Sequence, residues 1–204
     1  MNFRSVAQLS DQILTWSSAL PHDLDVIVGV PRSGLLAANL LALYRNLPMT
    51  DVEGLLEGRC IATGSARGPL VNGAASKHDP KRVLGEPRNV LVLDDSVGSG
   101  KTMQEIRERI GGADLPHRVQ YAAVYVSPSG TDAVDFYCEA IHFPRLFEWN
   151  ALHHGVLGQS CLDMDGVLCY DPTYEENDDG ERYLTFLREA RPLHRPTARV
   201  GWIV

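Results

Sequence analysis

Apolar runs alternate with amphipathic stretches along the first two thirds of the chain. Four or more consecutive apolar residues predict a buried strand, because a parallel strand covered on both faces needs no polar alternation. On this basis strands are expected at residues 25–30, 90–93 and 118–126, and a further strand is expected at 136–143. The spacing of apolar residues predicts helices within residues 1–20, 35–43 and 103–110. Strands separated by helices in this order indicate an α/β fold with a doubly wound, mostly parallel sheet.

One strand, at residues 90–93, leads into residues that suggest chemistry. It ends in two carboxylates, Asp94 and Asp95, and a Ser/Gly-rich turn then runs directly into a helix. Free backbone N–H groups and the positive end of the helix dipole converge at such a turn and favour phosphate. Carboxylates beside a phosphate site accept hydrogen bonds from hydroxyl groups, as a ribose diol would supply. The pattern therefore predicts a site for a phosphorylated sugar.

Two other interpretations of this turn remain open. Residues 98–102 (GSGKT) look like the end of a nucleotide-triphosphate loop, G-x-x-x-x-G-K-[ST]. The first glycine of that motif would fall on Asp95, and a carboxylate there would face the phosphates, so this interpretation is disfavoured. The other alternative is a purely structural turn between strand and helix, in which the acids cap the helix.

The same stretch resembles the 5-phosphoribosyl pyrophosphate (PRPP) motif of type I phosphoribosyltransferases. The shared features are an apolar strand, two acids, two variable positions and a small-residue turn ending in Gly-x-Thr. The resemblance implies that Asp94 and Asp95 contact the ribose hydroxyls and lie beside a Mg²⁺ cofactor held mostly by ligand and water. It also implies that the 5′-phosphate is bound by the following residues, Ser96, Val97, Gly98, Ser99, Gly100, Lys101 and Thr102.

A second small-residue turn, Pro31-Arg32-Ser33-Gly34, follows the strand predicted at residues 25–30. The planar donor fork of an arginine matches phosphate oxygens. Both turns follow parallel strands, so they are expected at the same edge of the sheet. This turn is similar to the pyrophosphate loop of the same family, which implies that Arg32, Ser33 and Gly34 bind the leaving pyrophosphate. A tight turn with a solvated arginine is the alternative.

Residues 51–88 form the least regular stretch and are rich in turn-forming and basic residues. So long an insert in a compact domain is usually functional. The resemblance implies a lid here that closes over the active site and excludes water. Candidates to reach the pyrophosphate from this lid are Lys77, His78, Lys81 and Arg82. The Lys77-His78 pair is similar to the lid of orotate phosphoribosyltransferases, and a solvated basic loop is the alternative.

Near the end of the chain, residues 161–168 (CLDMDGVL) resemble the first motif of the haloacid dehalogenase superfamily. In that superfamily the first acid, here Asp163, is a nucleophile toward phosphate, and the second, here Asp165, is a general acid and base. The later motifs of that superfamily would lie beyond residue 204. We therefore expect a truncated or vestigial motif without phosphatase activity. We predict a phosphoribosyltransferase-like domain at 1–148. Residues 149–204 would be a linker and a strand-plus-helix appendage packed on that domain.

Composition narrows the function classes. With 204 residues, 44% hydrophobic and 22% charged, the sequence is ordinary for a globular protein, and a formal net charge of −7 argues against a nucleic-acid surface. We expect no membrane segment and no signal peptide, since the sequence has neither a long apolar run nor a basic-then-apolar start. The four cysteines form no C-x-x-C pair, which favours reduced thiols in a cytoplasmic protein.

Together these features predict a pentosyltransferase that moves 5-phosphoribose from PRPP to a nitrogenous base, orotate-like or purine, and releases pyrophosphate. The partners are then PRPP and the base, and the resemblance is compatible with a homodimer. The alternatives are a non-catalytic regulator that binds PRPP or a nucleotide, an interaction protein that retains the fold without binding PRPP, and a Mg²⁺-dependent phosphatase if the C-terminal domain were complete. The sequence does not identify the acceptor base.

Overall fold

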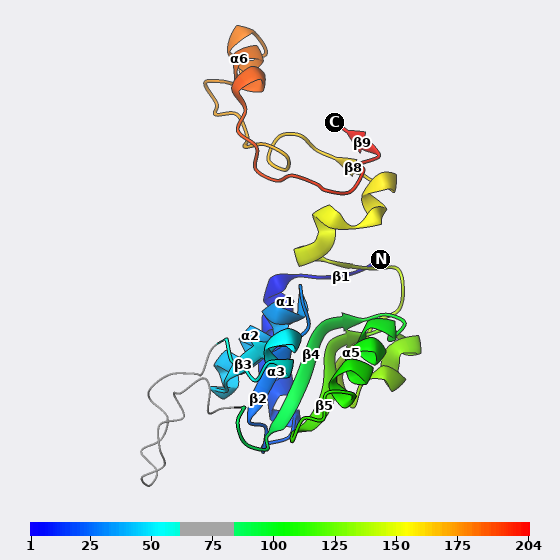
Figure 1. Cartoon of the computed structure of the whole chain (residues 1–204). Helices are drawn as coiled ribbons and strands as arrows, with labels where there is room; N and C mark the ends of the chain where they lie inside the picture. Colours follow the sequence, from blue (N-terminus) through cyan, green and yellow to red (C-terminus); the bar gives the residue numbers. More distant parts are fainter. Residues whose placement is uncertain (62–83) are drawn as a thin grey trace. The chain divides into compact units, whose positions relative to one another are not determined.

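The computed structural model describes residues 1–61 and 84–204, which divide into two units, Met1–Arg145 and Leu146–Val204 (Figure 1). Each unit is considered by itself below. Such a division does not test whether either unit folds alone, so the domain boundary placed after residue 148 stays a prediction. The four lid candidates, Lys77, His78, Lys81 and Arg82, lie outside the described residues.

The first unit is built on a five-stranded sheet in the order β3-β2-β4-β5-β6, and every neighbouring pair is parallel. The strands are β2 (Val26–Gly29), β3 (Met49–Asp51), β4 (Asn89–Val97), β5 (Arg118–Val126) and β6 (Phe136–Ala140). The predicted fold class, a mostly parallel α/β sheet, is confirmed. Because all five strands point the same way, the loops after them emerge at one edge.

Helices cover both faces of this sheet (Figure 1). On one face, α1 (Val6–Trp16) and α2 (Gly34–Arg45) pack on each other, and α2 packs on β2 and β4. The core of the other face joins α3 (Val52–Leu56) and α5 (Lys101–Gly111) to alternate residues of the strands, such as Val26 and Val28 of β2. Apolar side chains therefore point to both faces of the central strands, which explains their continuous apolar runs.

Several boundaries differ from the sequence-based expectation. Strand β4 continues to Val97, which pairs with Val126, so both acids lie within the strand and not after it. The strand predicted at 136–143 ends at Ala140. Short β1 (Asn2–Arg4) was not expected, and its backbone N–H at Asn2 donates to Pro144 O at 2.9 Å. These elements depend on partners distant in sequence, which local pattern does not reveal.

The second unit contains a parallel pair of short strands, β8 (Cys161–Leu162) and β9 (Trp202–Ile203), with α6 (Glu181–Glu189) between them in the chain. It also holds the 3₁₀ turns η3 (Glu148–His153) and η4 (Gly155–Gln159), and β7 (Arg145–Phe147) spans the division between the units. All of α6 is half-buried or exposed. The packing of this appendage on the first domain stays a prediction.

Two further properties concern the described residues alone. None of their helices combines the length with the apolar character that crossing a membrane requires. All four cysteines are free, with Cys60 and Cys169 buried.

Candidate functional site

The predicted site lies at the edge of the sheet where β2, β4 and β5 end side by side. Residues 31–34 follow β2, residues 98–100 follow β4, and the 3₁₀ turn η2 (Pro128–Ala133) follows β5. The start of α2 packs directly on β4: a side chain at Gly34 would approach the Asp94 Oδ1 atom to 2.9 Å. The arginine-bearing turn and the acid pair, 60 residues apart in the sequence, are therefore neighbours.

The acid pair is strongly shielded from water. Asp95 is 4% exposed, and Asp94 Oδ1 accepts a hydrogen bond from the Asp95 backbone N–H at 2.9 Å. Burial, together with the negative charge of Asp95, raises the pKa of Asp94 to about 8. A buried and a half-buried carboxylate side by side favour a ligand that brings hydroxyl donors or a cation to them.

The predicted phosphate-binding residues fall into three groups, in β4, in the turn after it and in α5. Ser96 and Val97 belong to β4, and the Val97 side chain is packed in the core, so a ligand could reach this residue through its backbone alone. Gly98 and Gly100 flank the exposed Ser99 in the turn before α5, and Gly100 has a left-handed φ of 83°. Lys101 and Thr102 are exposed in the first turn of α5, and the Lys101 Nζ atom lies 3.9 Å from Glu105 Oε1. A free helix N-terminus and a small-residue turn thus coincide here.

The turn after β4 is supported by residues that the sequence did not single out. Ser127 is 1% exposed; its hydroxyl donates to Gly98 O at 2.7 Å, and its backbone N–H donates to Val97 O at 2.9 Å. Any side chain at Gly130 would collide with Gly98 O. The sequence gives no sign of this role, because nothing local in residues 127–130 shows that they brace another loop.

On the other side of the acids, Arg32 is exposed, Ser33 is half-buried and Gly34 is buried at the start of α2. The Leu36 N–H donates to Ser33 O at 3.0 Å, which begins the helix. An exposed guanidinium next to a helix N-terminus can contact an anion held at this edge.

Sequence reasoning missed a second arginine at the site. The Arg145 guanidinium stacks on the Phe143 ring, with its Cζ atom 4.8 Å from the ring centroid. A side chain at Gly98 would lie 3.3 Å from Arg145 Nη2 and 4.0 Å from Phe143 Cζ. Phe143 is 65% exposed and so lies outside the core, whereas Phe147, four residues further on, is buried. No local sequence motif marks Phe143 and Arg145. They lie near Gly98 only because the folded chain brings them there.

The two carboxylates of the acid pair suit a Mg²⁺ ion that takes its remaining ligands from water and substrate. Among the described residues, no group of three or more His, Cys, Asp or Glu side chains is arranged to hold a metal ion. Mg²⁺ commonly takes one or two protein carboxylates and completes its octahedron with water and substrate phosphates. Asp94 and Asp95 match that pattern, and a nearby cation would lower the pKa of Asp94 toward its ordinary range.

The second acid motif differs in its surroundings. Asp163 follows β8 and is exposed, whereas Asp165 is half-buried and accepts a hydrogen bond from the Tyr183 hydroxyl at 2.9 Å. The Cys169 thiol also contacts Asp165, at 3.6 Å. The first motif lies within a parallel strand and the second follows one, and the second is more open to solvent.

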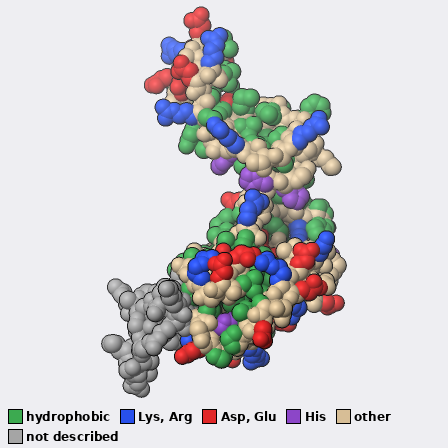
Figure 2. Space-filling view, viewed as in Figure 1, with side chains coloured by type: hydrophobic (Ala, Val, Ile, Leu, Met, Phe, Trp, Pro, Cys, Tyr) green, Lys and Arg blue, Asp and Glu red, His purple; other side chains and the backbone are tan. Residues whose placement is uncertain are grey.

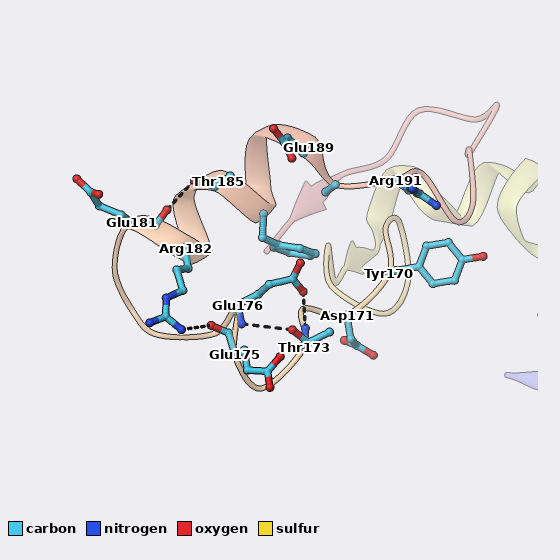
Figure 3. A pocket seen from close by; sticks show the side chains of 12 residues that line it. Tyr170, Asp171, Thr173, Glu175, Glu176, Glu181, Arg182, Thr185, Glu189 and Arg191 are labelled. Carbon is cyan, nitrogen blue, oxygen red and sulfur yellow. Dashed lines mark hydrogen bonds between the residues drawn. The ribbon is translucent and has the colours of Figure 1, made fainter.

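A hollow of about 1080 Å³ lies elsewhere in the second unit, between residues 170–176 and α6 (Figure 3). Five of its lining residues are acidic and two are arginines; the full lining is Tyr170, Asp171, Thr173, Glu175, Glu176, Glu181, Arg182, Thr185, Phe186, Glu189, Ala190 and Arg191. Such a lining disfavours a polyanionic ligand. On the face drawn in Figure 2, the described acidic and basic side chains are interspersed, without a basic stripe of the kind that nucleic acid requires.

A parallel α/β sheet with a small-residue turn, an arginine turn and an acid pair at one edge is typical of proteins that bind phosphorylated sugars or nucleotides. A sequence model of the phosphoribosyl transferase domain matches residues 3–156. The chain therefore belongs to the phosphoribosyl transferase domain family.

Similar proteins agree with this assignment. A xanthine-guanine phosphoribosyltransferase from Cereibacter sphaeroides is 30% identical over 137 residues, which are 62% of this chain and 74% of that protein. One from Ruegeria sp. is 26% identical over 64% of this chain and 76% of that protein. A hypothetical protein from Neisseria gonorrhoeae, solved with bound ppGpp, has a TM-score of 0.52 at 14% identity, covering 74% of this chain and 90% of its own. This last likeness shows the fold alone.

The family assignment confirms the predicted activity, transfer of 5-phosphoribose from PRPP to a nitrogenous base by a pentosyltransferase. The roles of individual residues stay predictions. The family match ends at residue 156, so the resemblance of residues 161–168 to haloacid dehalogenases also stays a prediction.

Proposed function

We propose that this protein transfers the 5-phosphoribosyl group of PRPP to a purine base. The observation that carries this proposal is the contact between the start of α2 and β4, which brings the arginine turn beside the acid pair. The purine is supported by the two similar proteins named as xanthine-guanine phosphoribosyltransferases. An exposed aromatic ring next to the loop, Phe143, offers a surface on which a flat base can stack.

In the proposed reaction a ring nitrogen of the base attacks C1 of the ribose with its lone pair. The bond from C1 to the pyrophosphate oxygen breaks, and pyrophosphate leaves with that electron pair. The proton of the attacking nitrogen passes to solvent or to the leaving group. Positive charge develops at the ribose during this exchange, so catalysis depends mainly on positioning and on fixed negative charge.

Each part of the edge has one task in this scheme. Asp94 and Asp95 accept hydrogen bonds from the ribose hydroxyls and stabilise the developing cation. The backbone N–H groups of residues 98–102 hold the 5-phosphate, while Arg32, Ser33 and Gly34 hold the pyrophosphate. Asp94 and Asp95 would hold Mg²⁺ together with water and ligand oxygens, and the ion would supply positive charge to offset that of the pyrophosphate. The lid candidates Lys77, His78, Lys81 and Arg82 would exclude water from the reacting centre.

The proposal is tested by measuring pyrophosphate release from PRPP with Mg²⁺ and each of xanthine, guanine, hypoxanthine, adenine and orotate. We expect release with at least one 6-oxopurine and none with orotate. Release with orotate but with no purine would overturn the purine proposal and leave phosphoribosyl transfer intact. Binding of PRPP without release in any arm would instead support a non-catalytic regulator.

For residues 161–168 we propose shared ancestry with haloacid dehalogenases rather than activity. The support is the parallel pairing of β8 with β9, with α6 between them in the chain, because Asp163 then follows a strand of a βαβ unit. Hydrolysis of p-nitrophenyl phosphate with Mg²⁺ tests this: no turnover is expected. Turnover that disappears in Asp163→Asn would show an active phosphatase motif.

A further inference from the structure

The first unit places a positively charged side chain over the phosphate-binding turn from a distant part of the sequence. Arg145 lies at the end of this unit, just after Pro144, and its side chain is half-buried. Its Nη2 atom would be 3.3 Å from a side chain at Gly98, so the guanidinium sits against the turn that follows β4. Stacking on the Phe143 ring, with Arg145 Cζ 4.8 Å from the ring centroid, helps to hold the guanidinium in place.

The same guanidinium is also within electrostatic reach of the acid pair. Burial lowers the pKa of Arg145, while the negative charges of Asp95 and Asp94 raise it. An arginine keeps its charge in such surroundings. Arg145 therefore lies against the turn and also interacts with the charges of the acids. The ribose 5-phosphate part of PRPP is expected to extend from the acids to that turn.

A further cation near the turn, Lys101, lies beside an acidic residue of α5. The side chain of Lys101 is 82% exposed and lies 3.9 Å from Glu105, one helical turn further along α5. Backbone N–H groups at a helix N-terminus carry a partial charge of roughly half an elementary unit, less than a phosphate dianion brings. A full positive charge next to the turn would neutralise the rest of the phosphate charge. Of Arg145 and Lys101, Arg145 is the one whose guanidinium lies against the turn.

We propose that Arg145 is a substrate-binding residue that donates from its guanidinium to the 5-phosphate of PRPP, in addition to the backbone donors of residues 98–102. This inference rests on the proposed function for the nature of its ligand. It assigns Arg145 to the sugar-phosphate half of the substrate and leaves the pyrophosphate half to Arg32. The two arginines therefore discriminate between the two anionic ends of one molecule.

The experiment compares Arg145→Met, which keeps length and loses charge, with Arg145→Lys, which keeps charge and loses the planar fork. The matched control is Arg107→Met: Arg107 also stacks on an aromatic ring, Tyr121, at 3.9 Å, and its Nη2 atom lies 3.7 Å from Asp135 Oδ1. Binding of ribose 5-phosphate and of pyrophosphate is measured by calorimetry, and the KM for PRPP is measured where turnover occurs.

We expect Arg145→Met to weaken ribose 5-phosphate binding and to raise the KM for PRPP by about 10- to 100-fold, with pyrophosphate binding within about twofold of the original. Arg145→Lys should recover part of the loss, and Arg107→Met should show none. Equal weakening of both ligands, or an unchanged KM for PRPP, would overturn the proposal. If Arg145→Met does not fold, an Arg145→Lys variant with unchanged ribose 5-phosphate affinity and KM overturns it as well.

The two proposals fail in different ways. If the unaltered protein releases no pyrophosphate but Arg145→Met still loses ribose 5-phosphate selectively, transfer is wrong and the assignment of Arg145 stands. If the unaltered protein turns over and Arg145→Met matches it in the KM for PRPP, transfer stands and the assignment of Arg145 is wrong.

Discussion

The chain carries two acid motifs, one within a parallel strand and one directly after a parallel strand, and their surroundings differ. Asp94 and Asp95 lie in a central strand of a five-stranded sheet, with a helix start packed against Asp94. Asp163 and Asp165 follow a two-residue strand, and Asp163 is exposed. The comparison shows that burial and neighbouring loops make an acid motif better suited to binding and catalysis. Shielding from water strengthens every charge interaction there.

The largest expected effect comes from removing the charges of one motif at a time. Asp94→Asn combined with Asp95→Asn should lower the rate of pyrophosphate release by about 100- to 1000-fold, because the ribose loses its fixed negative partners. Asp163→Asn combined with Asp165→Asn should leave that rate within about twofold. Steady-state assays with PRPP, Mg²⁺ and the preferred base give both numbers. A comparable loss in both double variants would mean that the second motif also serves the transferase.

The next effect concerns the packing that joins the arginine turn to the acids. Gly34→Ala would push a methyl group against Asp94 Oδ1 and Leu93 O, each about 2.9 Å away. We expect a loss of about 1–3 kcal/mol in unfolding free energy, together with a higher KM for PRPP. Denaturant titration and kinetics measure these quantities.

Gly111→Ala is the matched control for this change. Gly111 lies near the end of α5 with nothing within 4 Å of a new methyl group, so stability should stay equal or rise by about 0.5–1 kcal/mol. If Gly34→Ala behaves like this control, the close contact between α2 and β4 does not exist in solution.

The raised pKa of Asp94 predicts a pH dependence of stability for the ligand-free protein. The folded carboxyl keeps its proton up to about pH 8, whereas the unfolded carboxyl, with an ordinary pKa of 3.8, loses it far earlier. Folding therefore binds a proton in this window, and the contribution of Asp94 to stability falls as the pH rises from about 4 to 8. Asp94→Asn should remove this effect, so its gain over the unaltered protein should grow by about 1–3 kcal/mol between pH 5 and pH 8.

Thermal and denaturant unfolding at the two pH values measure this gain. Asp163→Asn serves as the control, because it removes an exposed carboxylate outside the acid pair. If the stability gained by Asp94→Asn stays constant or shrinks toward pH 8, ionisation of Asp94 does not destabilise the folded protein.

The smallest effect tests whether the turn after β4 is braced from behind. Ser127→Ala removes the hydrogen bond to Gly98 O and should lower stability by about 1 kcal/mol, with a several-fold rise in the KM for PRPP. Ser160→Ala in the second unit removes a similar bond, from its hydroxyl to Val156 O at 2.9 Å. It should lower stability by a comparable amount without changing the KM. Equal KM values for both variants would argue against the bracing role.

Much of the first unit could be predicted because its signals are local. The apolar run before Asp94, the glycines at 98 and 100 and the turn at 31–34 are contiguous patterns, and parallel topology then brings both turns to one edge. Arg145 and Ser127 could not be found this way. Their contacts with Gly98 join residues 47 and 29 positions apart, and neither has a neighbouring sequence that marks it.

Element ends were also hard to predict. The strand was expected to stop before Asp94, yet it continues to Val97, since pairing with β5 and not the polarity of the side chains decides where it ends. In the second unit the resemblance at residues 161–168 indicated a strand, which β8 provides, but the environment of Asp165 depends on Tyr183 from α6. Contacts of this kind form after the chain folds, and hydrophobic periodicity does not contain them.

The central claim is that one substrate spans the acid pair, the turn after β4 and the arginine turn. A crystal structure of the protein with PRPP and Mg²⁺ tests it most directly. We predict the ribose hydroxyls on Asp94 and Asp95, the 5-phosphate on residues 98–102 and the pyrophosphate on residues 32–34. PRPP bound with its pyrophosphate away from residues 32–34, or in the hollow of the second unit, would contradict the claim.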